Sequence, residues 1–269
     1  MKIAIIAGSG DLPIQIANQN PEAFVLCIED HSTPSSFKNN SEIVSLINPS
    51  DWISKLKKHK VTHLVMAGKI DRISNGKFLV DVSTHDLIKK TLSLGDNSAL
   101  NLIEKFFNEY NFKIMPVTSI LKNCFFRKGF YSEELISKKL KDFVIQNAKF
   151  GINLLNKMSE FDFGQSVVVS NTIVYAIEAL EGTDEMIIRA GQLYNNYFQN
   201  NDFGPVLVKI PKLHQNFNLD LPVIGLETIK KCKELGFSSI VLSSKGTLIV
   251  DIDTVKDYLI KSKFCIYAI

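Results

Sequence analysis

Cysteine and histidine are scarce in this chain, and neither occurs in a ligand pattern. The 269 residues include four cysteines and five histidines, and no two of them form a CxxC, HxH or HExxH pair. Such pairs supply the ligands of zinc sites, and cysteines at regular spacing build the disulfide frameworks of secreted domains. We therefore expect a cytoplasmic protein with reduced cysteines and without zinc.

Long apolar runs and a strong charge of one sign are also missing. No apolar run approaches the about 20 residues that a membrane-spanning helix needs, and the opening MKIAIIA is too short for the apolar core of a signal peptide. The formal net charge of +3 is too small to indicate a nucleic-acid partner, although it allows weak attraction to anionic lipid or a phosphorylated ligand. No GxSxG or other common nucleophile motif occurs. The composition, 45% apolar and 22% charged, is that of an ordinary soluble globular protein.

Apolar runs alternate with helical patterns in the first half of the chain. We predict buried strands over Ile3–Ala7, Phe24–Ile28 and His63–Ala67, with turns and segments of helical spacing between them. Strands that alternate with helices in this way favour a mostly parallel, doubly wound sheet. Residues 1–130 are therefore predicted to form an N-terminal Rossmann-like domain.

The order of elements is more mixed in the second half. A charged segment over residues 132–149 has helical spacing, and we expect it within a bridging helical region, 131–160. Residues 161–269 are predicted to form a C-terminal mixed α/β domain. Its predicted elements are two strands within 167–177 around a polar turn, strands over 206–210 and at the end of the chain, helices over 186–197, 227–235 and 254–262, and a hairpin around Lys245 and Gly246.

A glycine turn, GSGDLP, follows the first predicted strand and opens a helix. In this setting Gly10, Asp11 and the backbone N–H groups beside them can face a phosphate. Glu29 and Asp30 end the next strand and would suit a ribose contact. Pro13 stands where the dinucleotide fingerprint has its third glycine, so the match is partial. A phosphate-facing turn and a merely tight turn remain equal alternatives, and a nicotinamide enzyme is the weaker reading.

Two further polar groups follow apolar segments of the first half. Lys69 comes directly after a predicted strand, and Asp96 and Asn97 follow a leucine and a glycine. Because the carboxyl ends of parallel strands meet at one edge of a sheet, where ligands bind, Lys69 could meet a phosphate there. Asp96 suits either a metal or a helix N-cap, and the residue pattern alone favours the cap.

The richest segment of the second half is EALEGTD, which comes directly after the predicted strand pair. Five of its residues fall where a strand should hand over to a helix, a good place to hold a metal or a phosphate: Glu178, Glu181, Gly182, Thr183 and Asp184. Gln165 precedes the same strand pair. The alternative is a plain helix start, with Thr183 as N-cap and acids in the first turn.

Lys209 and Asp220 carry the remaining candidate chemistry. Lys209 follows a predicted strand and could face a phosphate as a point charge. Asp220 precedes Pro222 in the segment DLPVIG, which cannot be a regular helix. A carboxylate among apolar residues is costly unless it is paired or bound to a metal, and the alternative is an aspartate that forms a turn.

Together these motifs resemble the LpxI family of UDP-2,3-diacylglucosamine diphosphatases, Mg²⁺-dependent enzymes of lipid A biosynthesis. The resemblance runs nearly the full length of the chain, and the two C-terminal blocks are the long and specific ones. The segments that carry it are IAGSGDLP, AG at residues 67–68, GD at 95–96, DFGQSVVV, EALEGTD, VK at 208–209 and DLPVIGLET.

The resemblance implies hydrolysis of UDP-2,3-diacylglucosamine to UMP and 2,3-diacylglucosamine 1-phosphate, with water attacking the sugar-side phosphorus. It implies two α/β domains, the C-terminal one catalytic, with the active site in the cleft between them. It places the catalytic aspartate at Asp220, either as a ligand of the metal or as the base that accepts the proton of water. The implied Mg²⁺ ligands (Mn²⁺ could substitute) are Asp220, Asp184, Glu181 and Asp96. The implied substrate contacts are Gly10, Asp11, Lys69, Asn97, Gln165, Gly182, Thr183 and Lys209.

The resemblance also allows a peripheral contact with the inner face of the inner membrane and a homodimer, and it gives no reason to expect nucleic acid. The chain departs from the family pattern at Asn97, Asn216 and Asn218. These departures motivate an alternative, a nucleotide-sugar or lipid-binding protein with weakened catalysis.

Overall fold

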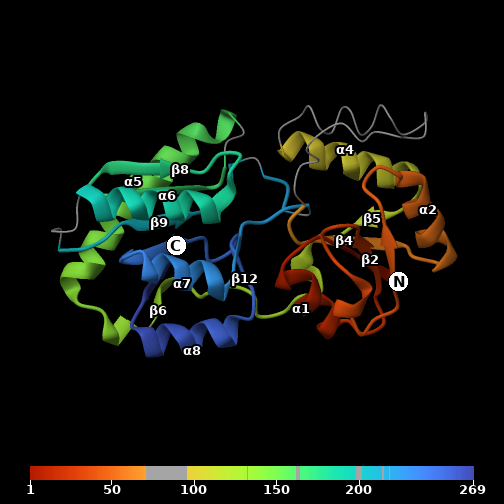
Figure 1. The fold of residues 1–269 in the computed structure, drawn as a ribbon, viewed down its shortest axis with the longest axis horizontal. Coiled ribbons are helices and arrows are strands. Elements are labelled where there is room, and N and C mark those ends of the chain that lie inside the picture. The colour runs from red at the N-terminus through yellow and green to blue at the C-terminus, as the bar shows by residue number, and fades with distance from the viewer. Residues whose placement is uncertain (71–95, 132, 162–163, 198–201, 214, 218) are drawn as a thin grey trace. The chain divides into compact units, whose positions relative to one another are not determined.

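The chain folds into two compact units, each built on its own β-sheet (Figure 1). The first unit is Met1–Lys122 together with Asn216–Asp220, and the second is Asn123–Gln215 together with Leu221–Ile269. The computed structural model describes residues 1–70, 96–131, 133–161, 164–197, 202–213, 215–217 and 219–269.

The first unit contains a five-stranded sheet in the order β3-β2-β1-β4-β5, and every neighbouring pair in it is parallel. The two central strands are near-continuous apolar runs, because a parallel sheet buries its strands on both faces. The strands are β1 (Ile3–Ala7), β2 (Phe24–Ile28), β3 (Ser41–Val44), β4 (His63–Ala67) and β5 (Lys113–Ile114).

Three helices of the first unit are α1 (Asp11–Gln19), α2 (Pro49–Lys58) and α4 (Asp96–Glu109). α2 and α4 share one buried cluster with alternate residues of β1 and β2, so both helices cover the same face of the sheet. Trp52 of α2 and Phe107 of α4 lie in this cluster, with ring centroids 6.1 Å apart.

The second unit contains a six-stranded mixed sheet in the order β6-β13-β11-β9-β7-β8. Its three central strands β13, β11 and β9 run parallel, and the pairs β6-β13, β7-β9 and β7-β8 are antiparallel. A separate parallel pair joins β10 to β12. The strands are β6 (Gly129–Tyr131), β7 (Ser166–Ser170), β8 (Ile173–Ile177), β9 (Val206–Lys209), β10 (Val223–Ile224), β11 (Ser239–Leu242), β12 (Leu248–Ile249) and β13 (Cys265–Ala268).

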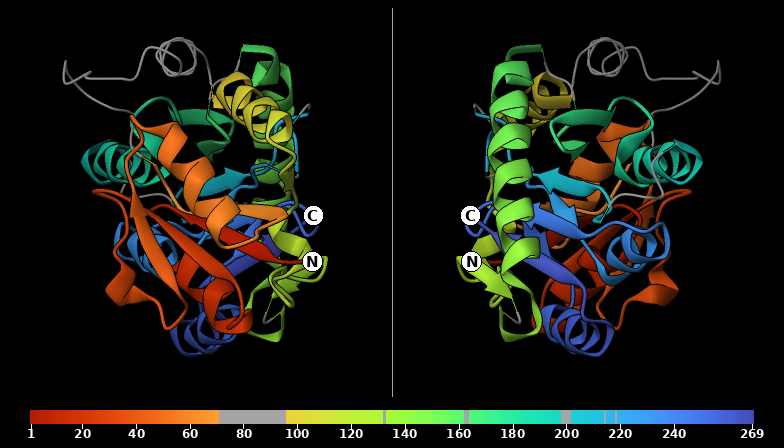
Figure 2. Two further views of the ribbon diagram at one scale, coloured as in Figure 1. Left: turned by 90° about the vertical axis from the view of Figure 1, so that its right-hand side faces the viewer. Right: turned by 90° about the vertical axis from the view of Figure 1, so that its left-hand side faces the viewer.

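Helices cover both faces of this sheet. The long helix α5 (Lys138–Met158) packs on one face, against the valines of β7 and β9 (Figure 2). Gly151 permits this contact, since a Cβ there would lie 2.6 Å from a methyl group of Val208. The other face carries α6 (Gly182–Tyr197), α7 (Leu226–Glu234) and α8 (Ile252–Ser262). Short 3₁₀ turns occur at Pro34–Ser36, Val117–Ser119, Glu133–Leu135 and Ser159–Phe161.

The predicted α/β class, with a parallel N-terminal sheet and a mixed C-terminal one, is confirmed. The division of the chain differs from the predicted boundaries at 130/131 and 160/161. α5 does not bridge two domains, because its apolar face is buried on the sheet of the second unit. The short segment Asn216–Asp220 belongs to the first unit, although the residues on either side belong to the second.

The predicted hairpin around Lys245 and Gly246 is wrong. The strands before and after this turn enter different sheets, β11 beside β9 and β13, and β12 beside β10. The buried side chain of Thr247 fixes the turn, since its hydroxyl donates to the Lys209 carbonyl and accepts from the Ser243 N–H. Among the described residues, no helix is both long enough and apolar enough to cross a membrane.

Candidate functional site

The carboxyl ends of β1 and β4 are tied together by their backbones. The N–H of Ser9 donates to the Lys69 carbonyl at 2.8 Å, and the N–H of Lys69 donates to the Ser9 carbonyl at 2.9 Å. A Cβ on Gly8 would lie 2.5 Å from the Lys69 oxygen, and one on Gly68 would lie 2.7 Å from the Ser9 oxygen. Both glycines are therefore required because two backbone segments approach each other closely here. Gly68 also has a φ of +91°. The crossing sets the direction in which both turns leave the sheet.

This crossing places Gly10, Asp11 and Lys69 at the carboxyl edge of the parallel sheet. Gly10 is the exposed N-cap of α1, with φ +95°, and within the described residues no side chain caps this helix end. The first-turn N–H groups of α1 therefore point to the edge at which open α/β sheets bind ligands. Asp11 is the first residue of α1, and the side chains of Asp11 and Lys69 are exposed. Three of the predicted contact residues thus lie together.

Asp220 lies in the first unit, on a short turn anchored to α4. Its N–H donates to the Asn216 carbonyl at 3.1 Å, and the Asn216 amide donates to the Glu104 carboxylate at 3.3 Å. Asp220 is half-buried. Asn216, one of the departures from the family pattern, therefore helps to hold the segment that carries Asp220. Asp96 and Asn97 are the first residues of α4, and their side chains, like all of Asn218, lie outside the described part of the chain.

In the second unit three strand ends meet at one edge of the sheet. β7 runs antiparallel to both neighbours, so its first residue lies beside the last residues of β8 and β9. Ser166 pairs with Lys209, and the N–H of Glu178 donates to the Ser166 carbonyl at 3.0 Å. The carbonyl of Gln165 accepts from the N–H of Ile210 at 3.1 Å. The pairing thus brings Gln165, Glu178 and Lys209 together from distant parts of the sequence.

Their polar groups form a buried network with Thr183. The Thr183 hydroxyl donates to Glu178 Oε1 at 2.7 Å, and Lys209 Nζ donates to Thr183 Oγ1 at 2.5 Å. Glu178 Oε2 accepts from the Gln165 N–H at 3.1 Å and lies 3.9 Å from Lys209 Nζ. Glu178 is 9% exposed and Lys209 is 7% exposed. Burial raises the pKa of Glu178, but the Lys209 charge and these hydrogen bonds outweigh it and lower the pKa below its usual value.

Thr183 does not act as the predicted N-cap. α6 begins at Gly182, whose φ is +78°, so Thr183 already lies in the first helical turn. Its hydroxyl proton goes to Glu178 instead of its oxygen capping the helix.

Glu181 and Asp184 are directed to cationic partners. Arg189 donates to the Glu181 carboxylate at 2.5 Å, and this bond lowers the pKa of Glu181. Asp184 lies 3.2 Å from Lys231 of α7 and accepts from Thr228 at 3.2 Å, so it joins α6 to α7. Among the described residues, no three His, Cys, Asp or Glu side chains are grouped so that they could hold a metal ion. The described carboxylates do not form a metal cage by themselves, and Glu181 and Asp184 already have ion-pair partners.

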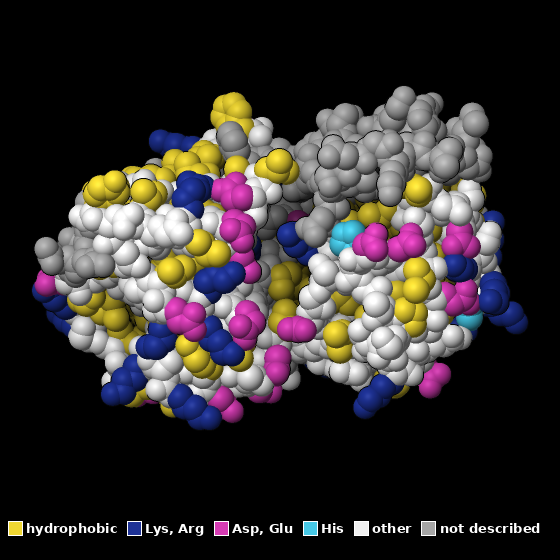
Figure 3. Space-filling model, in the orientation of Figure 1, with side chains coloured by type: hydrophobic (Ala, Val, Ile, Leu, Met, Phe, Trp, Pro, Cys, Tyr) yellow, Lys and Arg dark blue, Asp and Glu magenta, His cyan; other side chains and the backbone are white. Residues whose placement is uncertain are grey.

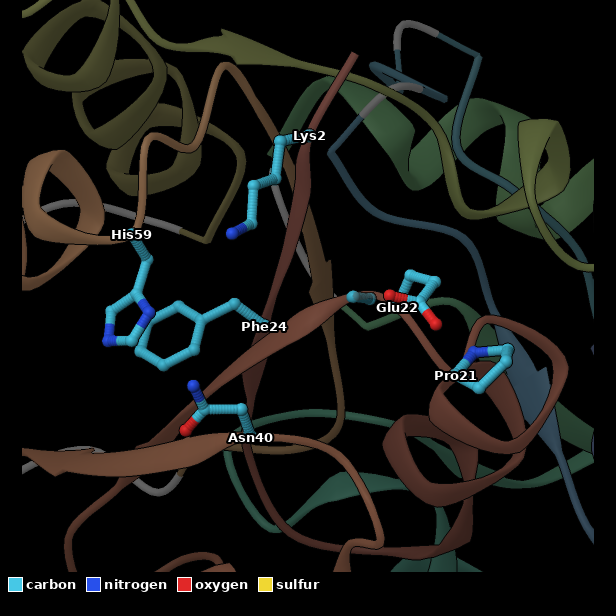
Figure 4. Close-up of a pocket in the computed structure, with 7 residues that line it drawn as sticks. Lys2, Pro21, Glu22, Phe24, Asn40 and His59 are labelled. Carbon is cyan, nitrogen blue, oxygen red and sulfur yellow. The ribbon is translucent and has the colours of Figure 1, made fainter.

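A small pocket lies at the other edge of the first sheet, near the amino ends of β1 and β2 (Figure 4). Its cavity volume is about 220 Å³, below the roughly 300 Å³ at which ligand pockets usually begin. His59 stacks on Phe24 there, and its ring is hydrogen-bonded to Glu42 at 2.8 Å. Ligands of open α/β sheets bind at the carboxyl edge, so this pocket is not a candidate substrate site. On the face drawn in Figure 3, acidic and basic side chains are interspersed, and charge alone singles out no partner.

Sequence reasoning placed Glu178 among the acids at the strand end but gave it no task of its own, and it missed Gly164, which packs against the network. Gly164 lies against Glu178, where a Cβ would come 2.5 Å from the Glu178 Cβ. The available signal was an acid directly after a strand, five residues before a threonine that opens a helix. That signal does not reveal the lysine, which comes from another strand.

Comparison with known proteins covers both units. The model of the LpxI N-terminal domain matches residues 2–124, and that of the LpxI C-terminal domain matches residues 132–267. A curated relative, the UDP-2,3-diacylglucosamine pyrophosphatase LpxI of Caulobacter vibrioides, is 24% identical over 263 residues. The match covers 94% of this chain and 92% of the relative.

Proposed function

The chain belongs to the LpxI family, and we propose that it hydrolyses the diphosphate bond of UDP-2,3-diacylglucosamine to UMP and 2,3-diacylglucosamine 1-phosphate. The observation that carries this proposal is the match of both domains, together with the likeness to a curated pyrophosphatase over nearly the whole of both chains. The polar groups at the strand ends support it. Diphosphate hydrolysis needs neutralisation of phosphoryl charge and an oriented water more than it needs covalent chemistry.

Three polar groups of the chain are proposed for these tasks. The uncapped N–H groups of α1 behind Gly10 and the ammonium of Lys209 are donors for phosphoryl oxygens. Asp220, the half-buried carboxylate on the Asn216 turn, is proposed to orient the attacking water and take up its proton. Water then adds to the sugar-side phosphorus, the bridging P–O bond breaks, and UMP leaves with the bridging oxygen.

Mg²⁺, replaceable by Mn²⁺, is proposed as the cofactor. When bound, it would neutralise the diphosphate oxygens of the substrate. Magnesium usually keeps several waters and is held by one or two carboxylates plus substrate phosphates. This mode suits the chain, because Glu181 and Asp184 are engaged by Arg189 and Lys231 and no described carboxylates form a cage. As the alternative to its role as the base, Asp220 is proposed as the main protein ligand, with Asp96 as a second.

The direct test is UMP release from UDP-2,3-diacylglucosamine by the purified full chain, with Mg²⁺, with Mn²⁺ and with EDTA. We expect release with either metal and its loss with EDTA. Hydrolysis in ¹⁸O-labelled water should place the label in the lipid phosphate, and label in UMP would refute attack at the sugar side. No release with either metal would refute the diphosphatase proposal.

The alternative is a nucleotide-sugar or lipid-binding protein with weakened catalysis. The departure at Asn97 favours it, whereas Asn216 has a role in holding the Asp220 turn. It predicts substrate binding without turnover in the same experiment. The lipid product also motivates a proposed peripheral contact with the inner face of the inner membrane. Co-sedimentation with anionic liposomes tests this contact, and the absence of binding would contradict it.

A further inference from the structure

Glu178 is a buried carboxylate to which the proposed reaction has given no task. Among the described residues, its one ion-pair partner is Lys209, which is itself 7% exposed. A buried ion pair seldom stabilises a fold, because removing both charges from water costs about as much as their attraction returns. Such a pair at the end of a strand, beside other ligand-facing groups, is a candidate for a functional role.

The chemistry of the three groups fixes the direction of every hydrogen bond between them. Glu178 is ionised and can only accept, and Lys209 can only donate. Thr183 has one proton, which goes to Glu178 Oε1, so its oxygen accepts from Lys209 Nζ. Thr183 therefore has no proton left for a ligand. Lys209 has two N–H bonds besides the one that it gives to Thr183, and these are the donors that remain for a phosphoryl oxygen.

The backbone holds Glu178 in this arrangement independently of the network. The N–H of Gly164 donates to the Glu178 carbonyl at 3.1 Å, and the next N–H, of Gln165, donates to Glu178 Oε2. A Cβ on Gly164 would lie 2.5 Å from the Glu178 Cβ and 2.6 Å from its carbonyl oxygen. The chain thus closes directly over the carboxylate. The Lys209 backbone is held as well, since its carbonyl accepts from the buried Thr247 hydroxyl at 3.1 Å.

We propose that Glu178 is a positioning residue, which acts through Thr183 to aim the Lys209 ammonium at a phosphate of the substrate. This inference rests on the proposed diphosphatase function and deepens it. Thr183 is then a link between two charges and not a donor to the substrate. Lys209 is the group that contacts the ligand.

The test is a set of variants assayed for UMP release and for thermal unfolding. Glu178→Gln keeps the shape but removes the charge, and Thr183→Val removes the link. Losing one charge-assisted hydrogen bond should lower kcat/KM roughly 10–100-fold in each. Thr183→Ser restores the hydroxyl and should remain within about threefold of the wild type. In a Lys209→Met background, adding Glu178→Gln should change kcat/KM by less than about threefold, because the ammonium that Glu178 positions is already absent.

A purely structural role of Glu178 gives a different pattern. Glu178→Gln would then still lower the rate in the Lys209→Met background. That result, or full activity of Thr183→Val, would overturn the positioning role. If Glu178→Gln does not fold, the Thr183→Val and Thr183→Ser pair decides alone. An inert wild type would instead refute the diphosphatase assignment, so the two failures are distinguishable.

Discussion

Gly164→Ala tests whether the backbone really closes over Glu178. The added Cβ would lie 2.5 Å from the Glu178 Cβ and 2.6 Å from its carbonyl oxygen, and neither atom can rotate away. Overpacking of this kind costs about 1–3 kcal/mol, and the lower entropy of the unfolded alanine chain offsets about 0.4–1 kcal/mol. We expect a net loss of about 1–2 kcal/mol. The melting temperature should fall by roughly 2–8 °C, on the scale of domains of about 150–250 residues.

The assay is thermal unfolding of the full chain, with Gly225→Ala as the matched control. Gly225 has an ordinary φ of −116°, and a Cβ there would lie 3.9 Å from its nearest neighbour, Val250. Gly225 is the N-cap of α7, where glycine is preferred to alanine, so its replacement should cost about 0.5–1 kcal/mol without any overpacking. Equal melting temperatures for Gly164→Ala and the wild type would refute the close packing on Glu178.

Two further predictions concern Glu178 and the glycine crossing of the first unit. The pKa of Glu178 in the folded protein lies below its ordinary 4.5, so the carboxylate contributes its full stability above about pH 4.5 and loses it as the pH falls through the folded pKa. In urea unfolding from pH 7 to pH 3, the free energy of unfolding should therefore fall more steeply for the wild type than for Glu178→Gln. Parallel curves would contradict this sign. Gly68→Ala combines a positive φ with a Cβ 2.7 Å from the Ser9 oxygen, whereas Gly10→Ala has the positive φ but no atom within 4 Å. The first should lose roughly 2–4 kcal/mol and the second about 1 kcal/mol in denaturant titrations, and equal losses would show that the crossing is not tight.

Most of the predicted strands that proved right are buried, although the partly exposed edge strand β8 also proved right. For example, β1, β2, β4 and β9 are short, mostly apolar runs. Such runs are typical of buried parallel strands, so their composition was enough to predict their positions. β3 and β6 were missed because both lie at a sheet edge and carry polar or glycine residues. The hairpin error arose because strand pairing is decided by distant partners, which local turn residues do not reveal.

The candidate site could be predicted only in part, for a similar reason. Strand-end residues such as Lys209 and Lys69 were found because the ends of parallel strands meet at one edge. The ion-pair partners of Glu181 and Asp184 depend on helix packing, and Arg189 and Lys231 carry no local signal for it. The role of Glu178 depends on hydrogen-bond direction in three dimensions, so no spacing rule reveals it.

The proposed hydrolysis depends most directly on the carboxylate of Asp220. The decisive measurement is the initial rate of UMP release from UDP-2,3-diacylglucosamine with Mg²⁺, compared between the wild type and Asp220→Asn. The control is Asp253→Asn, because the side chain of Asp253 on α8 is 88% exposed. We expect turnover by the wild type and the control and a loss of about 10²–10⁴-fold for Asp220→Asn, the usual effect of removing a positioned acid or base. An Asp220→Asn rate equal to that of the wild type would contradict this expectation.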